Sequence, residues 1–234
     1  MNFVWSGLSD KGLKRTSNED AYVCVPEFGL FVVADGVGGH LAGEVASRLA
    51  VESIVERMRQ VASDDDLTPV HDPQGHDGVP VRRLLIAIEH ANERVFEDAS
   101  RDERHSGMGT TVAAIYLVHG FVNICHVGDS RVYRIREGDI VPLTEDHVVM
   151  GNVLSRAVGA APLVEPSWRI EPAAAGDVFV LCSDGIHGPV ADEEIRDVVD
   201  GAPNCEAACA SLVALANSRG GPDNSTVVMV RLGS

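Results

Sequence analysis

One pattern constrains the fold of this chain more than any other: an apolar run that ends in an aspartate and a glycine-rich turn. The run 31–34 leads into Asp35, and three glycines lie among the next five residues. An uninterrupted apolar run is typical of a strand buried on both faces. Such a strand would carry the Asp35 carboxylate to the rim of a sheet, where the glycines let the backbone approach a ligand closely.

The same pattern occurs twice more. Residues 178–185 read Val-Phe-Val-Leu-Cys-Ser-Asp-Gly and end at Asp184, and residues 122–129 give a third version that ends at Asp129. Three buried runs that each end at an aspartate predict carboxylates gathered at one edge of a sheet.

Length and charge narrow the class of protein. With 234 residues we expect one catalytic domain, 1–234, with a substantial core. The net charge of −16 argues against nucleic acid or an anionic membrane as the main partner. No apolar stretch approaches the ~20 residues that span a bilayer, and the N-terminus lacks a signal-peptide pattern. The five cysteines contain no Cys-x-x-Cys pair, so we expect reduced thiols in a cytoplasmic protein, and we expect a monomer.

Periodicity predicts an α+β arrangement of antiparallel sheets covered by helices. The strand 110–118 is expected to open a meander with three further strands, and 168–171 and 177–181 flank a turn at 175–176. Residues 63–80, rich in Asp, Pro, Gly and His, read as a flexible loop whose His71 and His76 lack the partners of a metal site. The remaining predicted elements are strands 2–8, 21–25, 121–127, 131–136, 140–143 and 226–232, and helices 41–61, 81–101, 192–199 and 205–218.

Acidic residues recur at strand ends or in glycine-rich turns. Carboxylates that converge without cations repel one another, and some are forced to protonate. An all-oxygen donor set suits Mg²⁺ or Mn²⁺ rather than Zn²⁺, and one bridging carboxylate can hold two ions. We expect Asp35 to be that bridge, beside the Gly36 carbonyl, so that the ions generate a hydroxide for direct attack on phosphorus. The acidic residues are Glu19, Asp20, Asp35, Asp129, Asp184 and Asp223.

A phosphate substrate also needs a cationic anchor. Arg15 lies five residues before Asp20 in the same polar loop. A guanidinium can hold two phosphate oxygens at once, so Arg15 is the candidate substrate-binding residue.

These residues belong to a series of motifs along the chain. The motifs are Ser9-Asp10-x-Gly12-x-x-Arg15-x-x-Asn18-Glu19-Asp20-Ala21, Val33-Ala34-Asp35-Gly36-x-Gly38-Gly39-His40-x-Ala42-Gly43-Glu44, Met108-Gly109-Thr110-Thr111, Val127-Gly128-Asp129-Ser130-Arg131-x-Tyr133, Leu143-Thr144-x-Asp146-His147, Asn152-x-Leu154-x-Arg156-x-x-Gly159, Leu181-Cys182-Ser183-Asp184-Gly185 and Gly221-x-Asp223-Asn224-x-Thr226. In their residues and their order, these motifs resemble those of the bacterial PP2C-type (PPM family) metal-dependent serine/threonine protein phosphatases. The resemblance covers nearly the whole chain outside residues 63–80.

The resemblance implies a four-layer α-β-β-α sandwich, with two antiparallel β-sheets flanked by helices, and a binuclear Mn²⁺ or Mg²⁺ centre. By motif position Asp35 bridges two ions, Asp184 and Asp223 ligate one, and Glu19 and the Gly36 carbonyl serve the other. Asp20 would orient metal-bound waters, Asp129 with Asp184 would hold a weaker third ion, and Arg15 would bind phosphate. Asn224 would support its neighbour Asp223.

Two positions depart from the family pattern. Animal members have a histidine directly after Asp-Gly, proposed as a general acid, whereas this chain has Val37 there and His40 three residues further on. We therefore assign no catalytic histidine. Many bacterial members carry a longer flap after the Asp-His motif, and here only 148–151 separate His147 from Asn152. A shortened flap near 148–158 predicts a more open site with altered substrate choice.

The leading hypothesis is a phosphatase that removes phosphate from phosphoserine and phosphothreonine, acting on the targets of a Ser/Thr protein kinase. A non-catalytic regulatory module of the same fold is one alternative, and loss of Arg15, Asp35, Asp184 or Asp223 would have favoured it. Another is a phosphoacceptor domain or an aspartate-nucleophile phosphatase. Those need an Asp-x-Asp pair at a strand end, and neither Asp35 nor Asp184 begins one.

Overall fold

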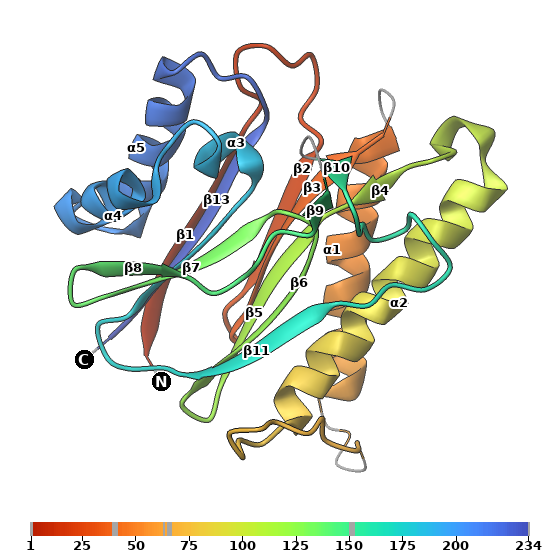
Figure 1. The fold of residues 1–234 in the computed structure, drawn as a ribbon, viewed down its shortest axis with the longest axis horizontal. Coiled ribbons are helices and arrows are strands. Elements are labelled where there is room, and N and C mark those ends of the chain that lie inside the picture. The colour runs from red at the N-terminus through yellow and green to blue at the C-terminus, as the bar shows by residue number, and fades with distance from the viewer. Residues whose placement is uncertain (1, 39–41, 63, 65–66, 150–152, 234) are drawn as a thin grey trace.

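The protein is a sandwich of two antiparallel sheets with helices on both outer faces (Figure 1). The computed structural model describes residues 2–38, 42–62, 64, 67–149 and 153–233. Helices α1 (Ala42–Val61) and α2 (Val79–Arg101) cover one sheet, and α4 (Asp192–Gly201) and α5 (Cys205–Ser218) cover the other. The expected α-β-β-α architecture is therefore confirmed.

Each sheet combines strands that lie far apart in the chain. The first sheet runs β1 (Phe3–Asp10), β13 (Ser225–Leu232), β12 (Val178–Cys182), β7 (Arg131–Arg136) and β8 (Asp139–Pro142). The second runs β11 (Ser167–Pro172), β6 (Phe121–Val127), β5 (Val112–Val118), β3 (Leu30–Val37) and β2 (Asp20–Val25), and β4 (Gly109–Thr110) pairs with β3. The short strands β9 (Val148–Val149) and β10 (Val153–Leu154) form a separate pair, and α3 (Asp184–His187) and a 3-10 turn (Glu103–His105) complete the elements.

The apolar run of β3 is buried on both faces, as its sequence predicts. Phe31 and Val33 pack between the two sheets, in the core that also holds Phe179 and Leu181 of β12. The alternate residues Leu30, Val32 and Ala34 belong to the core beneath α1 and α2. Because side chains alternate across a strand, a strand between two cores is apolar at every position. β12 is built in the same way, with Val178, Val180 and Cys182 under α4 and α5.

Strands 110–143 do not form the single meander that the sequence predicted. β5 and β6 pair in the second sheet, whereas β7 and β8 pair in the first. The chain crosses between the sheets at residues 128–130, where Gly128 has φ +95°, a conformation that favours glycine. The pattern of a hairpin is the same in either sheet, so strand periodicity cannot reveal this crossing.

Strands 168–171 and 177–181 flank a turn at 175–176, as predicted. They lie in different sheets, because β11 pairs with β6 and β12 pairs with β13 and β7. Consequently the three aspartate-ended runs do not meet at one edge of one sheet. Asp35 lies near the end of a strand of the second sheet, Asp184 follows a strand of the first, and Asp129 lies in the crossing between them.

The cysteines and the loop before α2 agree with the sequence predictions. All five cysteines lie among the described residues, and each is a free thiol. Residues 67–78 form neither helix nor strand, as expected for that loop, while 63 and 65–66 lie outside the described residues. None of the helices in the described part of the chain is both long and apolar enough to cross a membrane.

Candidate active site

The ends of the two sheets enclose an acidic cleft of about 290 Å³. It brings together seven of the eight residues that the sequence singled out, and Leu154, Val37 and Thr111 also line it. The eighth, Asp20, does not line the cleft, and its carboxylate accepts a hydrogen bond from Ser183. The seven residues are Arg15, Glu19, Asp35, Gly36, Asp129, Asp184 and Asp223.

 Gly36 offers its backbone carbonyl, and the other six residues offer side chains.

The end of β3 is fixed by two threonines of the neighbouring segment. The Asp35 carbonyl accepts hydrogen bonds from the Thr111 backbone N–H at 2.8 Å and from Thr110 Oγ1 at 2.9 Å. The Asp35 N–H donates to Thr111 Oγ1 at 3.0 Å, and that hydroxyl also bonds to Ser130 Oγ at 2.7 Å. Because Ser130 follows Asp129 in the crossing, these bonds hold the two aspartates in fixed relation.

Glycines let three segments meet at the floor of the cleft. A Cβ on Gly36 would lie 2.1 Å from the Gly43 carbonyl oxygen, and a Cβ on Gly43 would lie 2.0 Å from Glu19 Oε2. No side chain fits at either position, so the start of α1 packs directly on β3 and on Glu19. The Gly36 N–H donates to the Glu19 carbonyl at 3.1 Å and completes this junction.

Asn224 ties the N-terminal loop to Asp223. Its Oδ1 accepts from the Glu19 N–H at 2.8 Å, and its Nδ2 donates to the carbonyls of Lys11 and Ser17 at 2.8 and 2.9 Å. The Asn224 N–H itself donates to Asp223 Oδ1 at 2.8 Å. One side chain thus positions residues from both ends of the chain.

The carboxylate of Asp20 faces Ser183, a residue that the sequence reasoning did not assign. Ser183 Oγ donates to Asp20 Oδ2 at 2.7 Å and accepts from the Thr226 N–H at 3.0 Å. The other Asp20 oxygen, Oδ1, is buried without a hydrogen-bond partner in the described structure, and so is Asp184 Oδ1. The Ser-Asp-Gly sequence at 183–185 is the signal that could have pointed to Ser183.

Burial and mutual repulsion shift the acids of the site in one direction. Burial, reinforced by the neighbouring aspartates, raises the pKa of Asp35 well above its usual value. Burial also raises the pKa of Asp20 and that of Asp129 to about 6 each, and the pKa of Asp184 is raised for the same reason. The cleft therefore holds more negative charge than it can stabilise by itself.

Arg15 partly offsets this charge. Its Nη2 lies 2.6 Å from Asp223 Oδ2, and its side chain is about half exposed. The hydrogen bond to Asp223 raises the pKa of the guanidinium, so Arg15 stays charged. Sequence reasoning placed Arg15 at the site, but the ion pair with Asp223, far away in the chain, could not be foreseen.

Comparison with known proteins identifies the family. The sequence profile described as protein phosphatase 2C matches residues 14–217. The chain belongs to the protein phosphatase 2C family.

Relatives of known structure share the whole fold. The catalytic domain of the serine/threonine protein phosphatase PstP, solved with two manganese ions, is 32% identical and superposes with a TM-score of 0.83 over 99% of both chains. PppA, described as a key regulatory component of the type VI secretion system in Pseudomonas aeruginosa, is 34% identical, with a TM-score of 0.83 over 99% of this chain and 98% of that one.

A curated relative is longer than this chain. The serine/threonine protein phosphatase PstP of Mycobacterium tuberculosis is 32% identical over 243 aligned residues, which cover 96% of this chain and 44% of the relative. The chain thus spans less than half the length of that protein.

The donor set of this family member fits hard divalent cations. The cleft offers carboxylates and a backbone carbonyl, and two buried carboxylate oxygens have no protein partner in the described structure. Among the described residues, no three His, Cys, Asp or Glu side chains are grouped closely enough to hold an ion on their own. Mg²⁺ suits such a site, because it keeps several waters and binds through only one or two carboxylates.

Two departures from the family pattern are only partly visible. Val37 lines the cleft where animal members carry histidine, whereas His40 lies outside the described residues. Residues 150–152, in the segment where we predicted a shortened flap, also lie outside the described residues, but Leu154 of β10 lines the cleft. No histidine contributes to the cleft lining within the described ranges. His187, which sequence reasoning missed, donates from Nε2 to the Asp129 carbonyl at 3.0 Å and positions that loop.

Proposed function

We propose that this chain is a metal-dependent serine/threonine protein phosphatase that hydrolyses phosphoserine and phosphothreonine. The observation that carries the proposal is the cleft itself, in which carboxylates with raised pKa values face one guanidinium. A relative that is 32% identical over 96% of this chain is named a serine/threonine protein phosphatase, and a related catalytic domain was solved with two manganese ions.

The proposed ligands are those that the resemblance to the family implies, and all but Asp20 line the cleft. Asp35 would serve two ions, Asp184 and Asp223 would hold one of them, and Glu19 with the Gly36 carbonyl would hold the other. When bound, Mn²⁺ or Mg²⁺ neutralises these carboxylates and activates water for attack on phosphorus. Asp20 would orient water, and Asp129 with Asp184 would hold a weaker third ion.

Arg15 is the proposed phosphate anchor. Its guanidinium is exposed enough to meet a substrate and is paired in this structure with Asp223. Once Asp223 is engaged elsewhere, the Arg15 guanidinium would be able to bind two phosphate oxygens. Arg15 would thus pair with Asp223 in the metal-free cleft and with phosphate in the substrate-bound cleft.

The proposed substrates are phosphoproteins that a Ser/Thr protein kinase has modified. We further propose that the chain acts as a single catalytic domain, as a monomer and in the cytoplasm. The shortened flap near 148–158 would leave the cleft open to folded protein substrates.

Phosphate release from a phosphothreonine peptide tests the function. With Mn²⁺ the protein should release phosphate, and an excess of chelator should abolish release until Mn²⁺ is restored. Turnover that persists at full rate in chelator would contradict the proposal. Complete inactivity with both Mn²⁺ and Mg²⁺ on every phosphopeptide tried would instead favour the non-catalytic alternative.

A further inference from the structure

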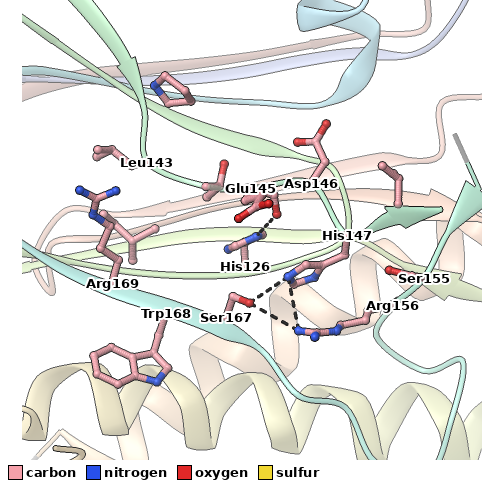
Figure 2. A pocket seen from close by; sticks show the side chains of 14 residues that line it. His126, Leu143, Glu145, Asp146, His147, Ser155, Arg156, Ser167, Trp168 and Arg169 are labelled. Atoms are coloured by element: carbon pink, nitrogen blue, oxygen red, sulfur yellow. Dashed lines mark hydrogen bonds between the residues drawn. The ribbon is translucent and has the colours of Figure 1, made fainter. Parts of the chain in front are cut away.

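The molecule has a second cavity, of about 660 Å³, which Figure 2 shows from close by. We call it the side cavity; His126, His147, Arg156 and Ser167 line it together with the segment 142–148. Its volume falls within the range of ~300–1,000 Å³ that is typical of ligand pockets.

The side cavity is connected to the cleft. Asp146 and Val148 line both the side cavity and a smaller hollow, which reaches Asp129 and Asp184. Those two aspartates also line the cleft. A peptide whose phosphorylated residue sits in the cleft can therefore extend a neighbouring residue into the side cavity.

Arg156 brings an uncompensated positive charge to this cavity. Its Nη1 donates to the Glu165 carbonyl at 3.1 Å and to Ser167 Oγ at 3.4 Å, and these bonds fix the guanidinium in place. Within the described part of the chain no carboxylate pairs with it. By contrast, its neighbour Arg169 pairs with Glu171. An unpaired guanidinium is notable in a chain of net charge −16.

The hydrogen bonds around His147 leave a second donor for a ligand. His147 Nδ1 accepts from the Gly128 N–H at 3.2 Å, so its proton lies on Nε2, which donates to Ser167 Oγ at 2.9 Å (Figure 2). Because Ser167 Oγ accepts from both His147 and Arg156, its own hydroxyl proton is left to donate. The contact of 3.5 Å between Arg156 Nη1 and His147 Nε2 then joins two donors and is no hydrogen bond.

The cavity walls hold this arrangement rigidly. The rings of His126 and His147 stack with centroids 4.5 Å apart, and His126 Nε2 bonds to the Glu145 carbonyl at 2.7 Å. Burial lowers the pKa of His147 to about 4, so the ring stays neutral near pH 7 and the tautomer is preserved.

The carboxylates of the opposite wall do not cancel the charge of Arg156. Asp146 is bound by two nitrogens of Arg131, at 2.9 and 2.8 Å. Glu145 is exposed, and water and salt screen its charge.

We propose that the side cavity binds a second anionic group of the phosphoprotein substrate, a carboxylate side chain or a further phosphate, through the Arg156 guanidinium and the Ser167 hydroxyl. This inference rests on the proposed phosphatase function and deepens it. The side cavity would then help to determine substrate choice, because it recognises residues that flank the phosphorylated one.

Steady-state kinetics on a peptide series tests the proposal. Each peptide carries one phosphothreonine and one added anionic residue, either glutamate or a non-hydrolysable phosphoserine analogue. Across the series, the added residue is moved one position at a time along both sides of the phosphothreonine. A peptide with glutamine in place of the glutamate is the neutral reference. The wild-type protein should show kcat/KM raised about tenfold at one register, mainly through a lower KM, as expected for one charge-assisted contact.

Variants then assign the preference to the cavity. Arg156→Gln should lose the register preference and Arg156→Lys should keep part of it. Arg101→Gln, which removes an exposed arginine of α2, should keep all of it. Glu145→Gln should strengthen the preference, because it removes a negative charge from the same cavity. A preference for glutamate and phosphoserine alike indicates recognition of charge, and a preference for phosphoserine alone indicates a phosphate site.

A Ser155→Glu variant tests the proposal even if the Arg156 variants fail to fold. Ser155 is exposed and lines the cavity, so the new carboxylate should occupy the anion site while every bond of Arg156 remains. It should remove the preference as Arg156→Gln does. A wild-type protein that hydrolyses all peptides equally, or an Arg156→Gln protein that keeps the preference, would overturn the inference. Failure of wild-type protein to hydrolyse even the neutral peptide would instead count against the phosphatase function.

Discussion

The acidic cleft and the side cavity lie next to each other and have opposite imbalances. In the cleft, carboxylates outnumber their partners, and Asp184 Oδ1 is buried with no hydrogen bond in the described structure. In the side cavity, a guanidinium and a hydroxyl have donor capacity to spare, and the surrounding histidines are fixed and neutral. We therefore propose cations as the ligands of the cleft and an anion as the ligand of the side cavity.

The difference has a structural origin. The cleft carboxylates come from strand ends and crossings of both sheets, so closing the sandwich forces them together at a cost in repulsion. The side cavity lies on β6, β11 and the segment before β9, where each acid found among the described residues either pairs with arginine or faces water. The two regions together form a path on which an anionic peptide meets metal at one end and arginine at the other.

Asp35→Asn should produce the largest effect. It removes the carboxylate that we assign to both ions, so kcat/KM for a phosphothreonine peptide should fall on the order of 10³-fold, corresponding to the several kcal/mol that metal ions supply. In chelator the same variant should melt at a higher temperature than the wild type, because a buried repelling carboxylate is gone. Asp197→Asn, at an exposed position of α4, is the matched control and should change neither value. Unchanged turnover in the Asp35 variant would remove the cleft from the mechanism.

Arg15→Ala should lower kcat/KM by about 10²-fold, less than Asp35→Asn does. This is the loss expected when a bidentate charged contact to phosphate is removed. Arg15→Lys should recover part of this loss, because the charge remains but the planar fork does not. Lys14→Ala, next in the chain, serves as the control for charge alone. Equal losses at Lys14 and Arg15 would show that the loop acts through its overall charge and not through one anchored guanidinium.

Binding of Mn²⁺ should weaken about tenfold for each pH unit below about 6, since at least one proton must leave a carboxyl when the ion binds. The pKa values of Asp20 and Asp129 are raised to about 6 in the folded protein. Folded carboxyls therefore hold protons that the unfolded chain has lost, and the metal-free fold loses stability as pH rises from about 4 to 6. His147 and His187, with pKa values lowered to about 4, act in the opposite direction.

Melting curves with and without Mn²⁺ separate these two contributions. The histidines contribute equally to both curves, so the difference in Tm reports the carboxylates. That difference should be small at pH 5 and should grow towards pH 7. A difference that is independent of pH would mean that the carboxyls do not titrate in this range.

His147→Ala should give the smallest effect and should act on the side cavity. It leaves the Gly128 N–H without its acceptor and removes the stack on His126, which should lower the free energy of unfolding by about 1–2 kcal/mol. It also frees Ser167, so the preference for an acidic flanking residue should weaken. Urea unfolding measures the first effect, with His71→Ala in the exposed loop as the control. A loss of stability equal to that of the control would show that the histidine pair does not support the cavity.

The sequence predicted the cleft better than the cavity for a physical reason. Asp35, Asp129 and Asp184 each follow a buried apolar run, so a local pattern marks every one of them. The ligand set as a whole came from the resemblance to a family, whose ordered motifs cover most of the chain. Which sheet each hairpin joins could not be predicted, because β5–β6 and β7–β8 have the same alternation.

No local sequence pattern identifies the residues of the side cavity. His126, His147, Arg156 and Ser167 come from separate elements, and only the return of β11 to the edge of β6 brings them together. Ser167 pairs with His126 in that register. Its role depends on which nitrogen of His147 carries the proton, and only hydrogen-bond geometry in three dimensions reveals that.

The central claim is that Asp35 is shared between two cations in a cleft that needs them. A calorimetric titration of metal-free protein with Mn²⁺ at pH 7.5, on wild type and Asp35→Asn in parallel, tests it most directly. The wild type should bind two ions per chain and release protons as it does so. Asp35→Asn should lose high-affinity binding of both ions at once. Two unaltered sites in the variant, or a loss confined to one site while the other keeps its affinity, would contradict the assignment of Asp35 as the shared ligand.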